Sequence, residues 1–363
     1  MMRLRLPGPT EVPEDIASIG SKPMINHRGA EMAELMHNVC EDLKICFGTK
    51  NEVHILTASG TGGLEAGIVN HISAEDEVLV ITIGIFGNRF LQLVEMVGAK
   101  PTVLKYDFGE AADANDVEAA LKKNPNIRFV VMTHNETSTG TTNYQIEKIA
   151  NIAKAHNCLI IVDAVSSLTA TPVETDKWGL DVVVSGSQKG WMMPPGLAFI
   201  SVSEEAWSIQ KECKTPRFYF DLLKHQESLK KGQTPWTPAL SLFYQLELAL
   251  NKLKSEGMDN VIARHATCAE KARSGIKNLG FELLAQEGYE SNAVTAIKAP
   301  EGLDVKSLLK TASQEFDTAF AGGQGSLGGK IFRFGHLGFV TEEDIDNGLN
   351  VLTKSLEAIG FRN

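Results

Sequence analysis

The chain has 363 residues, of which 43% are hydrophobic and 22% charged, a balance typical of a globular enzyme with a large and a small domain or one very large domain. The net charge of −10 argues against the basic surface that binding to nucleic acid or an anionic membrane requires, so we expect neither partner. No apolar run approaches the length of a membrane span and no secretory signal precedes Pro7, so we expect a cytoplasmic protein.

Five cysteines are scattered singly along the chain, with no CxxC pair and no spacing typical of metal ligands. Scattered single cysteines are usually small buried hydrophobic residues in a reducing compartment. We therefore predict neither disulfides nor a metal site.

Short apolar runs alternate with helix-like stretches through the first half of the chain. We predict strands at 77–84, 101–107, 127–136, 158–167 and 181–189, with helices between them at 88–98, 113–124 and 144–157. The strand runs are apolar throughout rather than alternating, which indicates strands covered on both faces by helices. The pattern predicts an α/β fold with a mostly parallel sheet.

The rhythm changes after residue 190. One more strand and a helix start are expected within 199–207, followed by long helices at 239–257 and 260–280. The remainder predicts short strands and further helices, at 281–285, 293–299, 304–316, 331–338 and 342–360. We expect residues 256–363 to form a smaller α+β domain next to the large one.

Ligands of open parallel sheets bind beyond the carboxyl ends of the strands, and two features stand where such ends are expected. The glycine-rich stretch TASGTGGLEAG (57–67) leads into an apolar helix, and its free backbone N–H groups suit a phosphate; the alternative is a helix start that needs small residues for packing. Asp163 ends the apolar run CLIIV, where a carboxylate needs a cation or a donor; the alternative is a cap for the following turn.

Two basic residues complete the set. Lys189 follows the apolar run VVV within SGSQKG and is either an exposed turn residue or a desolvated amine able to condense with a carbonyl. Arg333, in GKIFRFGHLG, is either a charge at a rim or a fork aimed at a carboxylate.

Together these features are the parts of a pyridoxal phosphate (PLP) site. Such a site needs an anion hole for the phosphate, a carboxylate for the pyridine nitrogen and a Schiff-base lysine. Lys189 lies 26 residues after Asp163, at the end of the next predicted strand, and Phe86 follows the strand at 77–84, where its ring could stack on the cofactor.

The ordered motifs resemble those of class V, fold-type I PLP-dependent aminotransferases, in particular the alanine–glyoxylate, serine–pyruvate and serine–glyoxylate group. The resemblance spans nearly the whole chain, through LPGPTEVP, INHRG, SGTGGLEA, GIFGNR, THNETSTG, VDAVSS, SGSQKG, TPWTPALS and GKIFRFGHLG. It implies a large PLP-binding domain at 21–255, and a segment at 1–20 that contributes to the active site and to the small domain.

The resemblance also implies a role for each matching residue. Lys189 would bind PLP and then carry the proton, and Asp163 would pair with the pyridine nitrogen, with Val165 and Phe86 on the two faces of the ring. The residues expected at the phosphate are Ser59, Gly60, Thr61, Ser187 and Gln188, with Thr237 or Thr234 supplied by a neighbouring subunit. Thr137 and Ser138 are expected near the ring hydroxyl, and Arg333, Gly8 and, at the entrance, His27 and Arg28 near the substrate.

The implied activity is a ping-pong transfer of an amino group from a small amino acid, alanine or serine, to glyoxylate or pyruvate, by a homodimer that shares its active sites. Aspartate or ureidoglycine as donor, and a cysteine desulfurase or other lyase, are alternatives within the same fold. The segment before Arg333, FAGGQGSLGGK, contains no cysteine, which disfavours a desulfurase. Two further alternatives are a nucleotide-binding module built on the SGTGGLEAG turn and a non-catalytic, hydrogenase-associated subunit. The first leaves Asp163, Lys189 and Arg333 unexplained, and the intact lysine and aspartate argue against the second.

Overall fold

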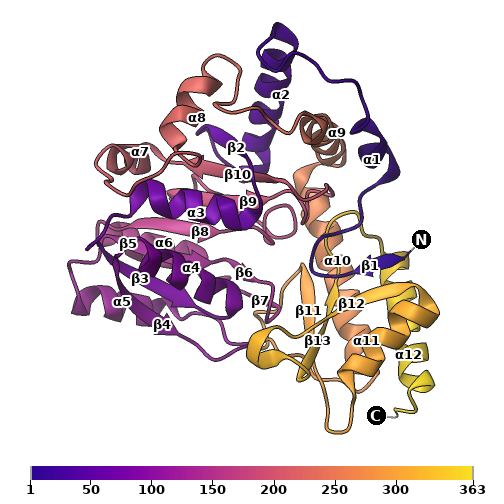
Figure 1. The fold of residues 1–363 in the computed structure, drawn as a ribbon. Helices are drawn as coiled ribbons and strands as arrows, with labels where there is room; N and C mark the ends of the chain where they lie inside the picture. Colours follow the sequence, from indigo (N-terminus) through magenta and orange to yellow (C-terminus); the bar gives the residue numbers. More distant parts are fainter. Residues whose placement is uncertain (1, 362–363) are drawn as a thin grey trace.

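The computed structural model describes residues 2–361, which form a large α/β part and a smaller α+β part (Figure 1). The large sheet has seven strands, in the spatial order β2 (Val53–Thr57), β10 (Leu197–Val202), β9 (Val182–Gly186), β8 (Leu159–Asp163), β5 (Phe129–Thr133), β3 (Glu77–Thr82) and β4 (Lys100–Lys105). Within this sheet only β10 runs antiparallel to its neighbours. The predicted mostly parallel α/β sheet is confirmed.

Helices cover both faces of the sheet, as the continuous apolar strands require. One face packs against α3 (Gly60–His71), α4 (Ile85–Met96), α7 (Glu204–Gln210) and α8 (Leu222–Leu229). The other face packs against α2 (Ala30–Phe47), α5 (Ala114–Lys123), α6 (Ile146–Ala155) and α9 (Leu240–Glu256). A short helix, α1 (Glu14–Ile19), lies against α9.

The small part is a second layered unit with its own core. Its sheet has the order β1 (Arg3–Arg5), β12 (Thr318–Gly322), β13 (Ile331–Gly335) and β11 (Val294–Lys298). Its core is built by α10 (Met258–Asn278), α11 (Val305–Phe316) and α12 (Glu342–Ala358). The N-terminal strand therefore pairs with a strand more than 300 residues away, and the chain then crosses to the large part (Figure 1).

Three expectations need correction. Residues 281–285 form no strand, because only Leu283 makes a single bridge, to Ile297. The strand expected to reach residue 136 ends at Thr133, and the chain continues into a small hairpin of β6 (Asn135–Glu136) and β7 (Thr141–Thr142). The glycines of SGTGG are not a turn before a helix but the first turn of α3 itself.

Two smaller features complete the description. A 3-10 turn, η1 (Gly325–Leu327), precedes β13. Among residues 2–361 no helix is both long and apolar enough to cross a membrane.

Candidate functional site

A cavity of about 300 Å³ lies where the carboxyl ends of the parallel strands meet the N-terminal segment. Asp163 is the last residue of β8, and Lys189 lies three residues beyond the end of β9. The residues that line the cavity are Gly8, Pro9, Ser59, Gly60, Thr61, Leu64, Phe86, Arg89, Thr137, Asp163, Val165, Ser166, Gln188, Lys189 and Pro195. Most of the residues proposed from separate stretches of sequence therefore share one cavity.

Lys189 is buried, with 8% of its surface exposed, and its environment favours the neutral amine. Burial lowers the pKa of Lys189 to about 8, although the charge of Asp163 acts in the opposite direction. Its Nζ donates a hydrogen bond to the carbonyl oxygen of Pro7. An amine with this pKa is uncharged in an appreciable fraction of molecules near neutral pH, as a nucleophile or proton carrier must be.

The N-terminal segment forms the roof over Lys189. Thr10 donates its backbone N–H to the carbonyl of Gln188 and its hydroxyl to the carbonyl of Lys189, both at 3.1 Å. Gly8 has φ +125°, and a Cβ at this position would lie 2.7 Å from Cδ of Lys189. Only glycine fits such a left-handed backbone in direct contact with the lysine chain.

Asp163 is 4% exposed, and its carboxylate faces a poorly solvated site. Burial raises the pKa of Asp163 to about 7, while the backbone N–H of Val165, 2.9 Å from Oδ1, lowers it. A carboxyl group in this state binds strongly to a cationic partner, because the partner restores the charge interactions that burial removed.

The anion cradle is the N-terminus of α3. The hydroxyl of Ser59 caps the helix by accepting the N–H of Gly62 at 3.4 Å, and the carbonyl of Ser59 accepts the N–H of Gly63. The N–H groups of Gly60 and Thr61 lie in the first turn, where no carbonyl of the helix can accept them, so they are free to bind an anion. The helix dipole also favours a negative charge at this end. Gln188 Oε1 is buried without a partner among the described residues, as expected for an amide side chain at a ligand site.

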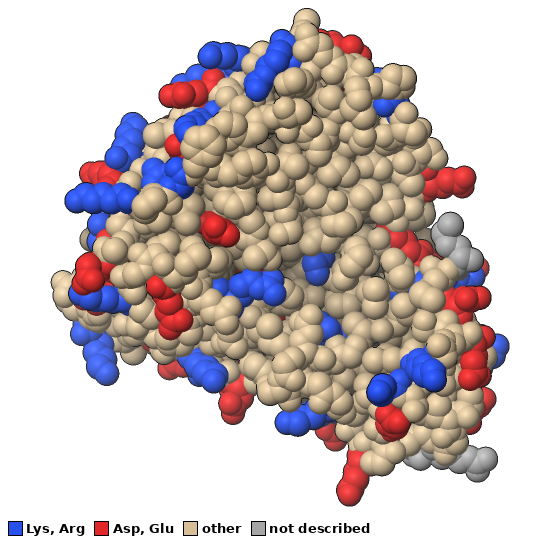
Figure 2. Space-filling view, viewed as in Figure 1, with Lys and Arg blue, Asp and Glu red and all other residues tan. Residues whose placement is uncertain are grey.

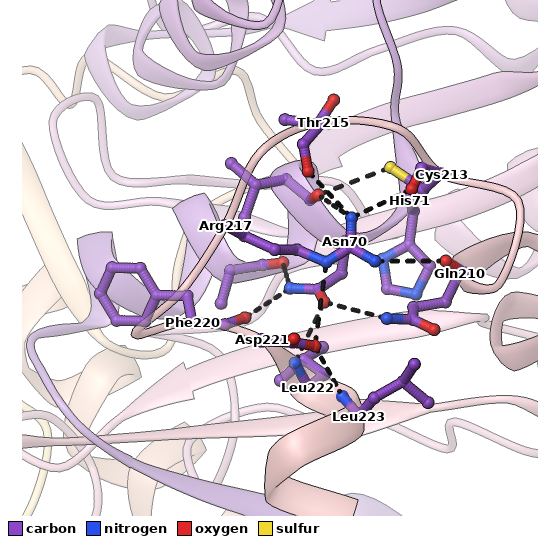
Figure 3. Close-up of polar contacts among 12 residues, drawn as sticks. Asn70, His71, Gln210, Cys213, Thr215, Arg217, Phe220, Asp221, Leu222 and Leu223 are labelled. Atoms are coloured by element: carbon purple, nitrogen blue, oxygen red, sulfur yellow. Dashed lines mark hydrogen bonds and ion pairs between the residues drawn. The ribbon is translucent and has the colours of Figure 1, made fainter. Parts of the chain in front are cut away.

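The other end of α3 is fixed by a buried polar network (Figure 3). Asn70 donates to the carbonyl of Phe220 at 2.6 Å and accepts the N–H of Leu222 at 3.0 Å. Arg217 donates to four carbonyl oxygens, one of them on α3 itself, one at the last residue of α7 and two in the segment that follows α7. The same segment lies beside the cradle, since a Cβ at Gly62 would be 3.1 Å from the ring of Phe220. The network thus holds the cradle helix in place.

Phe86 depends on a buried acid that sequence reasoning missed. Glu136 accepts the N–H groups of Phe86 and Gly87 at 3.1 and 3.0 Å, at the start of α4. Ser138 is tied to the same carboxylate through its hydroxyl, at 2.6 Å, and accepts the N–H of Ile85 at 3.0 Å. The structure therefore does not bring Ser138 into the cavity lining; it stabilises the helix that carries Phe86.

Thr137 lines the cavity together with Ser166. Its hydroxyl donates to that of Ser166 at 2.9 Å, and Ser166 in turn donates to the carbonyl of Asn135. Sequence reasoning missed Ser166 and Arg89, although both stand inside the quoted motifs VDAVSS and GIFGNR. For Arg89 a signal was present, because residues three apart on a helix share a face and Arg89 follows Phe86 by three.

Arg333 is 4% exposed and lies outside the residues that line this cavity. It donates to the carbonyl of Thr137 at 3.1 Å and, through Nε and Nη2, to that of Gly322 at 3.0 and 2.7 Å. These bonds use three of its five N–H groups, and the other two are free to bind a carboxylate. Its charge also contributes to the lowered pKa of Lys189, which indicates that the two side chains are near each other.

The remaining proposed residues are not brought into the cavity lining. Ser187 is occupied locally, donating to the carbonyl of Pro194 at 2.7 Å and accepting the N–H of Leu197. Thr234 donates to the carbonyl of Trp236, whereas Thr237 is exposed. His27 is half-buried, and the neighbouring Arg28 binds the carbonyls of residues 234 and 235.

Comparison with known proteins identifies the family. The model of the family described as "Aminotransferase class-V" matches residues 14–326. The chain belongs to the class V aminotransferases.

Relatives extend the match to nearly the full length. The chain is 42% identical to the "Soluble hydrogenase, small subunit" of Synechococcus sp. (strain PCC 6716), over 99% of this chain and 94% of that protein. It is 35% identical to the serine–glyoxylate aminotransferase of Hyphomicrobium methylovorum, over 98% of this chain and 90% of that protein. The crystal structure of pyridoxamine–pyruvate aminotransferase from Mesorhizobium loti superposes with a TM-score of 0.95 and 28% identity, covering 99% of this chain and 93% of that one.

The cofactor of a class V aminotransferase is PLP, and the cavity of this aminotransferase fits it. Lys189 would hold the cofactor covalently and Asp163 would face its pyridine nitrogen. The N–H groups at the N-terminus of α3 would donate to its phosphate, and the amide NH2 of Gln188, which also lines the cavity, would do so once it is turned toward it. When bound, PLP accepts the amino group of a donor and withdraws electrons from the donor's Cα.

The protein's own residues supply the rest of the chemistry. Nζ of Lys189, with its lowered pKa, would take up and return a proton, and the roof at Gly8 and Pro9 would limit access of water to it. Asp163 would be ionised when it faces a cationic nitrogen, because that charge would oppose the effect of burial. Lys and Arg side chains are visible along the boundary of the large and small parts, where anionic substrates would approach (Figure 2).

Proposed function

We propose that this aminotransferase moves an amino group from a small amino acid, alanine or serine, to a 2-oxo acid such as glyoxylate or pyruvate. The observation that carries the proposal is the limited size of the cavity that Lys189 and Asp163 line, about 300 Å³. This volume is at the lower end for ligand pockets, so it suits a substrate of few carbon atoms. The name of the Hyphomicrobium relative, serine–glyoxylate aminotransferase, supports the same substrate class.

Both half-reactions would use one site in a ping-pong sequence. Arg333 would bind the α-carboxylate that every donor and acceptor carries, helped by the backbone at Gly8. A bidentate arginine suits this role because its planar fork matches a carboxylate. The donor would leave as a 2-oxo acid before the acceptor binds in the same place.

We further propose a homodimer in which each subunit completes the other's phosphate site. Thr237 is the better candidate for this contact, because it is exposed while the hydroxyl of Thr234 is already bound to the carbonyl of Trp236. Replacing Thr237 with valine should weaken PLP binding without changing the mass measured by light scattering. A wild-type chain that is monomeric at micromolar concentration would contradict the shared site. The cytoplasmic location expected from the sequence stays a prediction.

The alternatives are weaker on specific grounds. A desulfurase needs a mobile, nucleophilic cysteine near the substrate, yet none of the five free cysteines lines the cavity. Burial raises the pKa of Cys40 and Cys46 to about 12, which suits packing rather than reactivity. A nucleotide-binding module would leave Lys189 and Asp163 without a role. The name of the Synechococcus relative, a hydrogenase subunit, is compatible with a non-catalytic subunit. Such a subunit would not need Lys189 and Asp163 either.

The test is a panel of amino donors, including aspartate and ureidoglycine, assayed with glyoxylate and with pyruvate on the purified, PLP-loaded protein. We expect alanine or serine to give the highest kcat/KM with one of the two acceptors. The absorbance of the bound cofactor should shift when donor alone is added and return with acceptor. If aspartate or ureidoglycine gives the highest kcat/KM, the proposed donor is wrong. If no pair of donor and acceptor is turned over, the proposed function is wrong.

A further inference from the structure

Arg89 borders the cavity and makes two contacts that place its charge between the cofactor's expected ring and phosphate. Its guanidinium carbon lies 4.7 Å from the centroid of the Phe86 ring. Its Nη1 donates a hydrogen bond of 3.0 Å to the hydroxyl of Thr61, in the first turn of α3. One half-buried cation thus connects the aromatic side of the cavity with the anion cradle.

A phosphate ester in this cavity needs a counter-charge that the cradle alone does not provide. A phosphate monoester carries about −1.5 to −2 charges at neutral pH, whereas a helix N-terminus contributes only about +0.5. Among the described residues that line the cavity, the cations are Arg89 and Lys189. The amine of Lys189 binds the carbonyl of Pro7 and is the expected attachment point of the cofactor, so it is committed elsewhere. Arg333 is held outside the lining by backbone carbonyls.

The bond to Thr61 also orients a donor. The hydroxyl of Thr61 accepts from Arg89, so its own hydrogen is free to point away from the guanidinium. An anion bound at the N–H groups of Gly60 and Thr61 is in reach of such a hydroxyl. The bond from the charged guanidinium polarises the hydroxyl, which strengthens the hydrogen bond that the hydroxyl donates to the anion.

We propose that Arg89 is a phosphate-binding and cofactor-positioning residue, which balances the phosphate charge and directs the hydroxyl of Thr61 toward it. The inference rests on the assignment of PLP to this cavity. It assigns a function to the arginine of GIFGNR, a side chain that binds no carboxylate among the described residues.

The experiment compares two ligands that differ only in the phosphate. The full-length chain, stripped of cofactor, is titrated with PLP and with pyridoxal, and each Kd is taken from the quenching of tryptophan fluorescence. Arg89→Met should raise the Kd of PLP by about tenfold or more and that of pyridoxal by less than about twofold, since charge-assisted hydrogen bonds to the phosphate are lost. Arg89→Lys should recover part of the loss, and Thr61→Val should weaken PLP selectively as well.

Arg128→Met is the matched control. Arg128 also lies over the ring of the next residue, Phe129, at 5.7 Å, but it lies outside the cavity lining, so both Kd values should stay unchanged. An unchanged Kd for PLP in Arg89→Met, or an equal loss for PLP and pyridoxal in both Arg89 variants, would overturn the proposal. A wild-type chain that binds neither ligand would instead refute the cofactor assignment and the function with it.

Discussion

The most direct test of the site's electrostatics is the replacement Asp163→Asn in the chain stripped of cofactor. Asparagine has nearly the same shape and keeps an oxygen that accepts the N–H of Val165, bonded at 2.9 Å in the wild type. The change therefore removes the charge of a buried carboxyl group, which is 4% exposed, with little effect on packing.

The magnitude follows from the pKa. Burial raises the pKa of Asp163 from 3.8 to about 7, and a shift of one pKa unit corresponds to about 1.4 kcal/mol, so the full effect is roughly 4 kcal/mol. The folded state keeps its proton up to about pH 7, while the unfolded chain releases it near pH 4. Between these values the folded state binds more protons, so stability falls as pH rises and levels off above pH 7.

The assay is urea denaturation at pH 4.5 and pH 8, at one protein concentration, followed by fluorescence. The side chain of the asparagine variant does not titrate. The variant should therefore unfold at nearly the same urea concentration as the wild type at pH 4.5, and at a distinctly higher urea concentration than the wild type at pH 8. Adding PLP should reverse the order at pH 8, because only the wild type offers a carboxylate to the pyridine nitrogen. If the difference between variant and wild type is the same at both pH values, Asp163 does not titrate in this range and the reasoning is wrong.

Three further changes test other parts of the site. Lys189→Ala should abolish turnover and the fixation of cofactor by borohydride, measured by mass spectrometry; an active variant would remove this lysine from the mechanism. Arg333→Met should raise the KM for both the amino acid and the 2-oxo acid by about 30-fold or more, because losing a desolvated partner of the carboxylate costs about 2–5 kcal/mol of binding free energy. An unchanged KM would show that the carboxylate binds elsewhere. Gly84→Ala would put a Cβ 2.3 Å from Cγ of the buried Glu136, so thermal unfolding should show a loss of about 1–3 kcal/mol, whereas Gly67→Ala, whose Cβ meets only ordinary contacts of 3.5 Å or more, should be neutral or stabilising. Equal stability of the two glycine variants would show that Glu136 can move without cost.

The sequence was sufficient for the elements whose pattern is local. Strands at 77–84 and 181–189 were predictable because an uninterrupted apolar run indicates burial on both faces, and the structure has β3 and β9 there. The segment at 281–285 is also mostly apolar, but Glu282 interrupts it and its neighbours provide only a single bridge, so it is not a strand. A short apolar run predicts that the segment is buried, but it does not predict which strand the segment pairs with.

Direction and neighbours were decided by the tertiary structure. The apolar run of β10 resembles the others, yet it lies antiparallel between β9 and β2, because a run of buried residues carries no information about strand direction. Likewise, nothing in residues 3–5 predicts a strand that pairs with residues 318–320.

The same division holds at the site. The sequence by itself determined which chemical groups are available at strand ends: Asp163 after one apolar strand and Lys189 after the next, with small residues for an anion beside them. Only the tertiary structure decided their partners, because Glu136 reaches the start of α4, Arg89 reaches Thr61 on α3, and Arg333 reaches Thr137 from the small part. Those contacts depend on how helices and domains pack side by side, and that packing arises from many weak interactions between residues far apart in the chain.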